Sequence, residues 1–183
     1  MRRLTAFAIL MGLLAGGCAK QGPAESGATA PDPTTERAVS IYEAVIRRLV
    51  TTGDSTFGEN PQFPVVYLLD RAKKEAANPE TADGEVAPLS NDVKSELLSA
   101  LSDLPIEFVS DQDAVIVPVE EGGGVKDDGV VVTLGLIPEG QEEVEVQASL
   151  YAGPLAATWL TYVVKRSSQG WKVTGTTGPI AIS

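Results

Sequence analysis

The sequence of 183 residues has no histidine and a single cysteine. Histidine is the usual general base of enzymes, a common metal ligand and the side chain that titrates near neutral pH. Its absence excludes Ser-His-Asp and Cys-His catalysis as well as histidine-ligated zinc sites. A single cysteine also excludes a disulfide bond within the chain.

Basic residues are scarce as well. The chain has 14 lysines and arginines against 25 acids, which gives a formal net charge of −11. Because no basic stripe is present to neutralise phosphates, the sequence predicts no nucleic-acid partner and no charge-driven binding to anionic lipid. Hydrophobic residues make up 43% of the sequence. This composition is globular, and the length is typical of one domain.

An uncharged apolar run lies near the N-terminus. It extends from Leu4 to Leu14, follows Arg2 and Arg3, and precedes three small residues. This order is typical of a signal peptide. Counted on to Ala19, the apolar stretch is 16 residues long, whereas a membrane-spanning helix needs roughly 20. We therefore predict a signal peptide at residues 1–17; removal of its two arginines would take the net charge from −11 to −13.

The only cysteine, Cys18, directly follows Ala15-Gly16-Gly17. The segment from Leu14 to Cys18 resembles the lipobox of bacterial lipoproteins, with Ala15 at the position where leucine is usual. The resemblance implies that Cys18 is lipidated on its sulfur and becomes the mature N-terminus. The protein would then be anchored by lipid at the extracytoplasmic face of a cell membrane. The alternative is a conventional signal peptide that is cleaved elsewhere.

The segment after Cys18 has the composition of a linker. Residues 19–35 contain three prolines, two glycines and no large apolar side chain. Such a segment predicts a flexible tether with a root-mean-square reach of roughly 23 Å. We therefore expect residues 18–35 to be the lipidated cysteine and its tether, and residues 36–183 to form one globular domain.

Two segments of this domain have helical periodicity. The first begins at Glu36, with Thr35 as its candidate N-cap, and the second is capped by Ser90 or Asn91 and stopped by Pro105. The apolar residues predicted to face the core are Ala38, Ile41, Tyr42, Val45, Ile46, Leu49 and Val50 in the first helix and Val93, Leu97, Leu98, Ala100, Leu101 and Leu104 in the second.

The rest of the domain has mainly β patterns. The apolar run at 63–69 predicts a buried strand, the charged segment 73–89 predicts a crossing of the surface, and the alternation at 143–150 predicts a strand with one wet face. Further strands are predicted at Ile106–Val109, Ala114–Val119, Gly129–Ile137, Leu155–Lys165 and Trp171–Thr174. Because successive strands with short turns pair antiparallel, we predict an α+β fold. Its two helices pack on one face of a curved, mainly antiparallel sheet.

This order of elements resembles the cystatin-like and NTF2-like folds, in which a curved antiparallel sheet wraps a helix. The C-terminal segment with Trp159 and Trp171 also resembles the end of many secreted bacterial domains of this shape. Such folds include enzymes, binding modules and assembly proteins, so the resemblance implies no function.

Acidic residues are concentrated in one segment. Residues 103–145 hold 12 acids and one base, and residues 146–183 hold three bases and no acid. Carboxylates are ligands for calcium, but the acids do not follow the EF-hand spacing, and we interpret the segment as a solvated surface. The weak candidates for a metal site are Glu120, Glu121, Asp127 and Asp128.

Three of the aromatic residues fall on one predicted hairpin, namely Trp159, Tyr162 and Trp171. The odd spacing of Trp159 and Tyr162 places their side chains on opposite faces of a strand. These residues either pack in the core or line a ligand pocket between the sheet and a helix.

Two functional hypotheses follow. The sequence has no complete catalytic motif, which favours a non-catalytic binding or envelope-assembly module. Its partners would be the membrane, through the lipid on Cys18, and an unidentified protein or small molecule; no cofactor is predicted. The alternative is a carboxylate-based or calcium-assisted hydrolase, which needs two buried acids that face each other across a pocket.

Overall fold

The computed structural model describes residues 32–52, 57–58, 60–80, 84–140 and 142–183. These belong to a compact unit, Pro31–Ser183. The predicted signal peptide, Cys18 and most of the predicted tether lie outside the described residues. Among the described residues, no helix is both long enough and apolar enough to cross a membrane.

Helix α1 spans Pro33–Thr51, so it begins earlier than predicted. Asp32 is the N-cap in place of Thr35, and its carboxylate accepts a hydrogen bond from the backbone N–H of Thr35 at 3.3 Å. Pro33 is well suited to the first helical turn, where its missing N–H has no partner to lose. Residues 33–35, predicted as tether, therefore belong to the helix. The predicted apolar face is confirmed by the buried residues Ile41, Tyr42, Val45, Ile46, Leu49 and Val50.

Helix α2 spans Asn91–Ala100. The Ser90 hydroxyl caps it by accepting a hydrogen bond from the N–H of Val93 at 3.2 Å. Its buried stripe is narrow, because Val93, Leu97 and Leu101 lie four residues apart on one face. Leu98 falls outside that stripe and is 44% exposed, so its prediction as a core residue was wrong.

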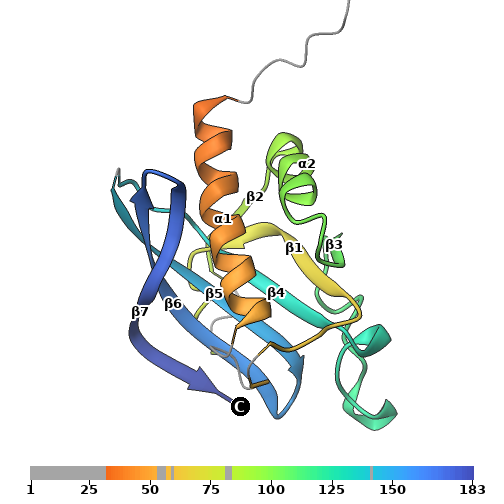
Figure 1. Ribbon diagram of the computed structural model, residues 1–183. Coiled ribbons are helices and arrows are strands. Elements are labelled where there is room, and N and C mark those ends of the chain that lie inside the picture. The colour runs from red at the N-terminus through yellow and green to blue at the C-terminus, as the bar shows by residue number, and fades with distance from the viewer. Residues whose placement is uncertain (1–31, 53–56, 59, 81–83, 141) are drawn as a thin grey trace, which may run out of the picture. The chain divides into compact units, whose positions relative to one another are not determined.

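The helices lie on one face of a seven-stranded sheet (Figure 1). The strand order is β2-β1-β4-β5-β6-β7. Strand β3 pairs with the same edge of β1 as β2 does: β3 pairs with residues 66–69 of β1 and β2 with residues 71–73. The strands are β1 (Val66–Lys73), β2 (Val86–Pro88), β3 (Ile106–Val109), β4 (Val130–Gly135), β5 (Glu143–Gly153), β6 (Ala156–Ser167) and β7 (Gly170–Ile182). This arrangement is the predicted α+β fold.

The sheet contains two parallel pairs that the sequence analysis did not predict. Strands β4 to β7 form the predicted antiparallel meander. Strand β1, however, runs parallel to both β3 and β4. The chain reaches β3 through β2 and α2, and a crossover of this kind returns it to the end at which β1 began.

Several predicted strands differ from the structure. Residues 114–119 do not form a strand; they make one isolated bridge, Ile116 to Val125, and a short 3-10 helix at Val119–Glu121. Strand β2 lies within the segment predicted to cross the surface. Strand β7 runs eight residues beyond Thr174 to Ile182, where Gly175, Gly178 and Pro179 weaken the strand pattern.

The sheet is covered differently on its two faces. Its helix face joins α1 and α2 in one continuous hydrophobic core. On the opposite face, Val115 and Val125 from the segment between β3 and β4 pack on Val65, Tyr67 and Val131. Val115, which was predicted to lie in a strand, and Val125 therefore cover the β1 side of this face, and the part over β5 and β6 is less covered. In the part of the chain that the structure describes, the residues of both cores lie within the unit Pro31–Ser183. Because a domain with its own hydrophobic core can fold alone, we expect this unit to fold by itself.

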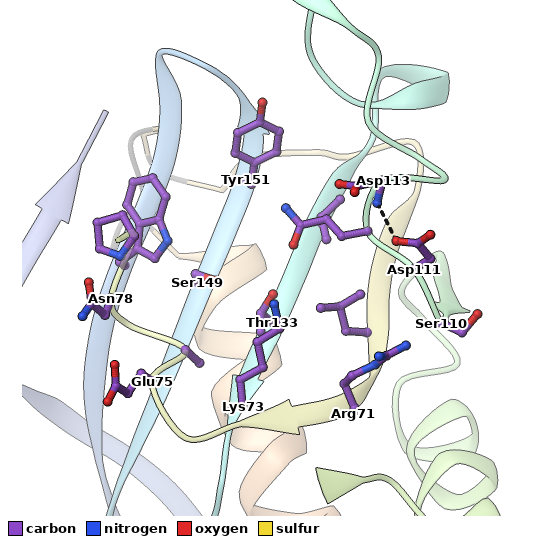
Figure 2. A pocket seen from close by; sticks show the side chains of 16 residues that line it. Arg71, Lys73, Glu75, Asn78, Ser110, Asp111, Asp113, Thr133, Ser149 and Tyr151 are labelled. Carbon is purple, nitrogen blue, oxygen red and sulfur yellow. Dashed lines mark hydrogen bonds between the residues drawn. The ribbon is translucent and has the colours of Figure 1, made fainter. Parts of the chain in front are cut away.

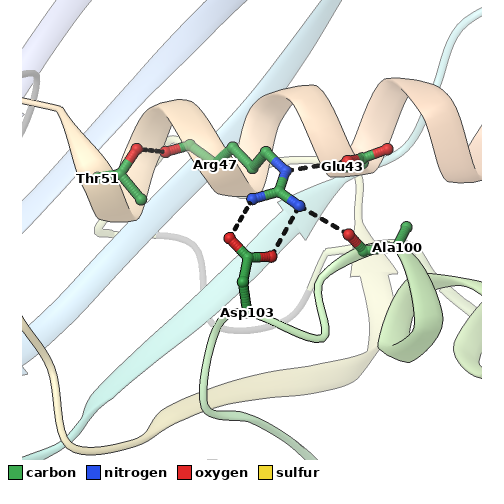
Figure 3. Close-up of polar contacts among 5 residues, drawn as sticks. All are labelled: Glu43, Arg47, Thr51, Ala100 and Asp103. Atoms are coloured by element: carbon green, nitrogen blue, oxygen red, sulfur yellow. Dashed lines mark hydrogen bonds and ion pairs between the residues drawn. The ribbon is translucent and has the colours of Figure 1, made fainter.

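Arg47 joins the two helices (Figure 3). Its guanidinium donates two hydrogen bonds to the Asp103 carboxylate, at 2.8 and 2.9 Å, one to Glu43 at 2.9 Å, and one to the carbonyl of Ala100 at 2.7 Å. These hydrogen bonds lower the pKa of the Asp103 carboxyl. A bidentate pair of this kind is more specific in geometry than an ordinary surface ion pair.

The Arg47–Asp103 pair predicts a pH dependence of stability. A carboxyl whose pKa is lower in the folded state stabilises the fold above its unfolded pKa, which is close to 4. This contribution is lost as the pH falls through the lowered folded pKa. We expect the difference in unfolding free energy between the wild type and Asp103→Asn to be constant above about pH 5 and to shrink as the pH falls below 4. Urea denaturation at a series of pH values measures it. The exposed Glu145 has no ion pair among the described residues, so Glu145→Gln is the control; an equal trend in both variants would contradict the prediction.

Candidate ligand-binding site

A cavity of about 470 Å³ lies on the sheet face opposite the helices (Figure 2). Its floor is formed by side chains of β1, β4, β5 and β6 that point away from α1. One wall is the turn that follows β1, with Glu75, Ala76, Asn78 and Pro79, and the other is the loop 110–113 after β3. Cavities of small-molecule sites have volumes of roughly 300–1,000 Å³, so the size suits a small ligand.

Strand register places three floor residues in one row. Thr133 of β4 lies opposite Ser149 of β5, and Ser149 lies opposite Trp159 of β6. On the other side of Thr133, the pairing of β1 with β4 shifts register between Leu68 and Ala72, and the cavity-lining residues of β1 in this stretch are Leu69 and Arg71. The row across the sheet is therefore Thr133, Ser149 and Trp159, with Arg71 at its β1 end: two hydroxyls and an indole ring beside a cation.

The two hydroxyl residues of this row are buried without protein partners. Thr133 is 6% exposed and Ser149 is 8% exposed. Within the part of the chain that the structure describes, neither side chain has a hydrogen bond, although both line the cavity. Because both hydroxyls face the cavity, a ligand that enters it can hydrogen-bond to both groups without breaking any hydrogen bond within the protein.

A hydrogen bond fixes one wall of the cavity to the sheet. The backbone N–H of Ala77 donates to the side-chain oxygen of Gln147 on β5 at 3.0 Å. In the second wall, the Asp111 carboxylate accepts a hydrogen bond from the N–H of Asp113 at 3.0 Å, which is a contact within the loop itself. The first wall is therefore preformed, which lowers the entropy cost of binding.

The cavity has charges of both signs. Arg71 and Lys73 are half-buried on the β1 side of the floor, whereas Glu75, Asp111 and Asp113 are exposed on the walls. The Arg71 guanidinium contacts the neighbouring Asp70 at 3.4 Å through Nε alone. Its remaining N–H groups are the donors available to a ligand.

The structure separates the three aromatic residues considered in the sequence. Trp159 lines the cavity. Tyr162 is fully buried on the opposite face, in the core beneath α1, as the odd spacing from Trp159 predicts. Trp171 lies at the edge of the helix-side core, where the Arg37 guanidinium is 5.5 Å from its ring centroid. The cavity thus lies on the far face of the sheet and not between the sheet and a helix.

The acidic metal candidates do not form a cluster. Among the residues described, no group of three or more acidic or cysteine side chains is placed to hold a metal ion. The exposed Asp127 accepts a hydrogen bond from the Tyr67 hydroxyl at 2.8 Å, which raises the pKa of Tyr67 and ties the segment to β1. Asp128 and Glu120 are exposed, and the side chain of Glu121 is outside the described set.

Sequence reasoning missed the two floor hydroxyls and the charged residues around them. Ser149 falls on the face of the 143–150 alternation that was predicted to be wet. Thr133 is the single polar residue within Val130–Leu134, and this interruption of an apolar strand was the available signal.

Comparison with models of protein families, with curated proteins and with solved structures finds no match to this chain.

Proposed function

We propose that the protein is a lipid-anchored, extracytoplasmic, non-catalytic module that binds a small polar ligand in the cavity on the far face of its sheet. The observation that carries the binding role is the pair of buried hydroxyls, Thr133 and Ser149, which have no partner among the described residues. The features that support the anchor are the apolar run from Leu4 to Leu14 and the small residues before Cys18.

The position of the acids favours binding over acid–base chemistry. The hydrolase hypothesis needs two buried carboxyls that face each other. The three acids that line the cavity, Glu75, Asp111 and Asp113, are all exposed on its walls. The groups that are buried in the cavity floor are hydroxyls, which act as hydrogen-bond donors and acceptors for a ligand.

The binding role predicts opposite effects of one double variant on stability and on binding. Thr133→Val with Ser149→Ala removes two hydroxyls that have no protein partner, so we expect the free protein to be equally stable or up to about 1 kcal/mol more stable. Thermal melts of the wild type against a panel of amino acids, organic acids, sugars and nucleosides should reveal one class that raises the melting temperature. The same double variant should raise the Kd of that ligand roughly tenfold, as expected for the loss of two neutral hydrogen bonds.

The matched control for this test is Thr161→Val. Thr161 is half-buried on β6, two residues from Trp159, but does not line the cavity. It should leave ligand binding unchanged. Clear destabilisation of the free double variant would mean that the hydroxyls are structural, and the binding role would lose its supporting observation.

The anchor predicts the behaviour of Cys18→Ser in a lipoprotein-producing bacterium. The wild type should be recovered with the membrane fraction and extracted into detergent, because several acyl chains on one cysteine contribute about 0.8 kcal/mol for each buried methylene. The variant should remain unprocessed or become soluble. Phase separation in detergent, together with the intact mass of the N-terminal peptide, measures both effects. Normal cleavage and detergent partitioning of the variant would show that the anchor assignment is wrong.

A further inference from the structure

Among the described residues, four of the five charged side chains that line the cavity come from β1 and the wall beside it, which we call the charged end; the fifth, Glu75, is on the other wall. In Figure 2, Arg71 of β1 lies on the same side of the cavity as Asp111 and Asp113 of the loop that follows β3, and Ser149 lies on the other side of Thr133. Two positive side chains, Arg71 and Lys73, come from the floor strand β1. Two negative side chains, Asp111 and Asp113, come from the wall beside it. Positive side chains on β1 and negative side chains on the adjacent wall therefore face the same end of the cavity.

A site with both positive and negative side chains favours a ligand that carries both charges. A simple anion near Arg71 also approaches the two wall carboxylates, and a simple cation near Asp111 also approaches the two bases. A ligand with a negative and a positive group at the same end can pair with both sets at once. Charge complementarity of this kind contributes specificity, because each mismatched charge is repelled.

The β5–β6 side of the floor, away from β1, carries the aromatic residues of the cavity, and we call it the aromatic end. Tyr151 of β5 and Trp159 of β6 line it. Trp159 lies two strands from Thr133 along the floor row, or roughly 10 Å at the usual spacing of about 4.8 Å between strands. Aromatic rings offer large flat surfaces on which an apolar or aromatic group can stack. The two hydroxyls lie between the charged end and the aromatic end.

We infer that the cavity binds a small zwitterion of the α-amino-acid type with an apolar or aromatic side group. Its carboxylate pairs with Arg71 and Lys73, its ammonium group pairs with Asp111 and Asp113, and its side group extends over the hydroxyls towards Tyr151 and Trp159. This inference rests on the proposed binding function and names the class of ligand that the same cavity takes.

The test uses the unit Pro31–Ser183 with Trp171→Phe, which makes Trp159 the sole tryptophan. Four probes separate the two charges: L-phenylalanine, N-acetyl-L-phenylalanine without the ammonium, L-phenylalaninamide without the carboxylate, and N-acetyl-L-phenylalaninamide with neither. Because charge-assisted hydrogen bonds are the strong ones, we expect L-phenylalanine to change the Trp159 emission with a Kd at least about tenfold lower than that of any other probe.

Each of two double variants that remove charges from the cavity should abolish one of these differences in affinity. Arg71→Gln with Lys73→Gln should abolish the preference for L-phenylalanine over its amide. Asp111→Asn with Asp113→Asn should abolish the preference over the N-acetyl form, while the asparagine oxygen at 111 keeps the wall hydrogen bond. The exposed Lys172, which lies outside the cavity lining, provides the control Lys172→Gln, and this variant should keep both preferences.

The outcomes separate the ligand class from the binding function. Equal affinities for all four probes, or no emission change with any of them, would overturn the zwitterion class. The binding function is decided separately, by the panel melts and the Thr133→Val with Ser149→Ala variant. A preference for one singly charged probe would overturn the zwitterion and identify the ligand as a simple anion or cation.

Discussion

Leu97→Ala is expected to destabilise the protein by about 2–5 kcal/mol, the range found when a buried leucine is truncated and leaves a cavity. Leu97 is fully buried on α2, in the core shared with α1 and the sheet. For a domain of this size, each kcal/mol lowers the melting temperature by roughly 2–4 °C. Thermal melts of the unit Pro31–Ser183 should therefore show a decrease of roughly 4–20 °C.

The adjacent residue provides a matched control. Leu98 follows Leu97 on the same helix but is 44% exposed, so Leu98→Ala should change stability by no more than about 0.5 kcal/mol. Ile46→Ala on α1, which is also fully buried, should behave like Leu97→Ala. Equal melting temperatures for the two leucine variants would show that α2 does not pack on the sheet through the stripe of Val93, Leu97 and Leu101.

The helices could be predicted from the sequence because their signals are local. The i, i+3, i+4 spacing from Ile41 to Val50 determines which face of α1 is buried, and Ser90 marks the start of α2. The error at Leu98 has the same origin: a helix that packs through one row of residues buries a narrower stripe than the hydrophobic pattern suggests. The early start of α1 depends on the cap at Asp32, which competes with Thr35 for the same role.

The sheet pairing and the cavity depend on contacts that are far apart in the sequence. Val115 was predicted to lie in a strand and Val125 was not predicted to be buried, but both are buried because the segment folds over the far face of β1 and β4. Likewise, Thr133, Ser149 and Trp159 form a row with Arg71 at its β1 end only through the pairing of four strands. No local pattern shows which polar residues on a strand lie opposite one another, so the candidate site could not be predicted from periodicity.

Gly135→Ala tests the close approach of β4 and β5 beside the cavity. A Cβ atom at Gly135, the last residue of β4, would lie 2.8 Å from the carbonyl oxygen of Gln147 and 2.9 Å from its N and Cβ atoms. Two of these are backbone atoms of β5, so the clash is relieved only if the strands move apart. The carbonyl of Gly135 also accepts a hydrogen bond at 3.0 Å from the hydroxyl of Tyr42. Burial of this tyrosine raises its pKa to about 12, so the hydroxyl keeps its proton at physiological pH.

We expect Gly135→Ala to cost about 3 kcal/mol, at the upper end of the usual range for overpacking. It should also weaken ligand binding, because the side chain of Gln147 holds the cavity wall at Ala77. Gly175→Ala is the matched control: Gly175 is also in a strand, β7, but a Cβ there meets no heavy atom within 4 Å. This variant should stay within about 0.5 kcal/mol of the wild type. Urea denaturation of both variants measures their unfolding free energies. A steric effect at the β4–β5 contact lowers the stability of Gly135→Ala alone, whereas a general effect of alanine in a strand changes both variants.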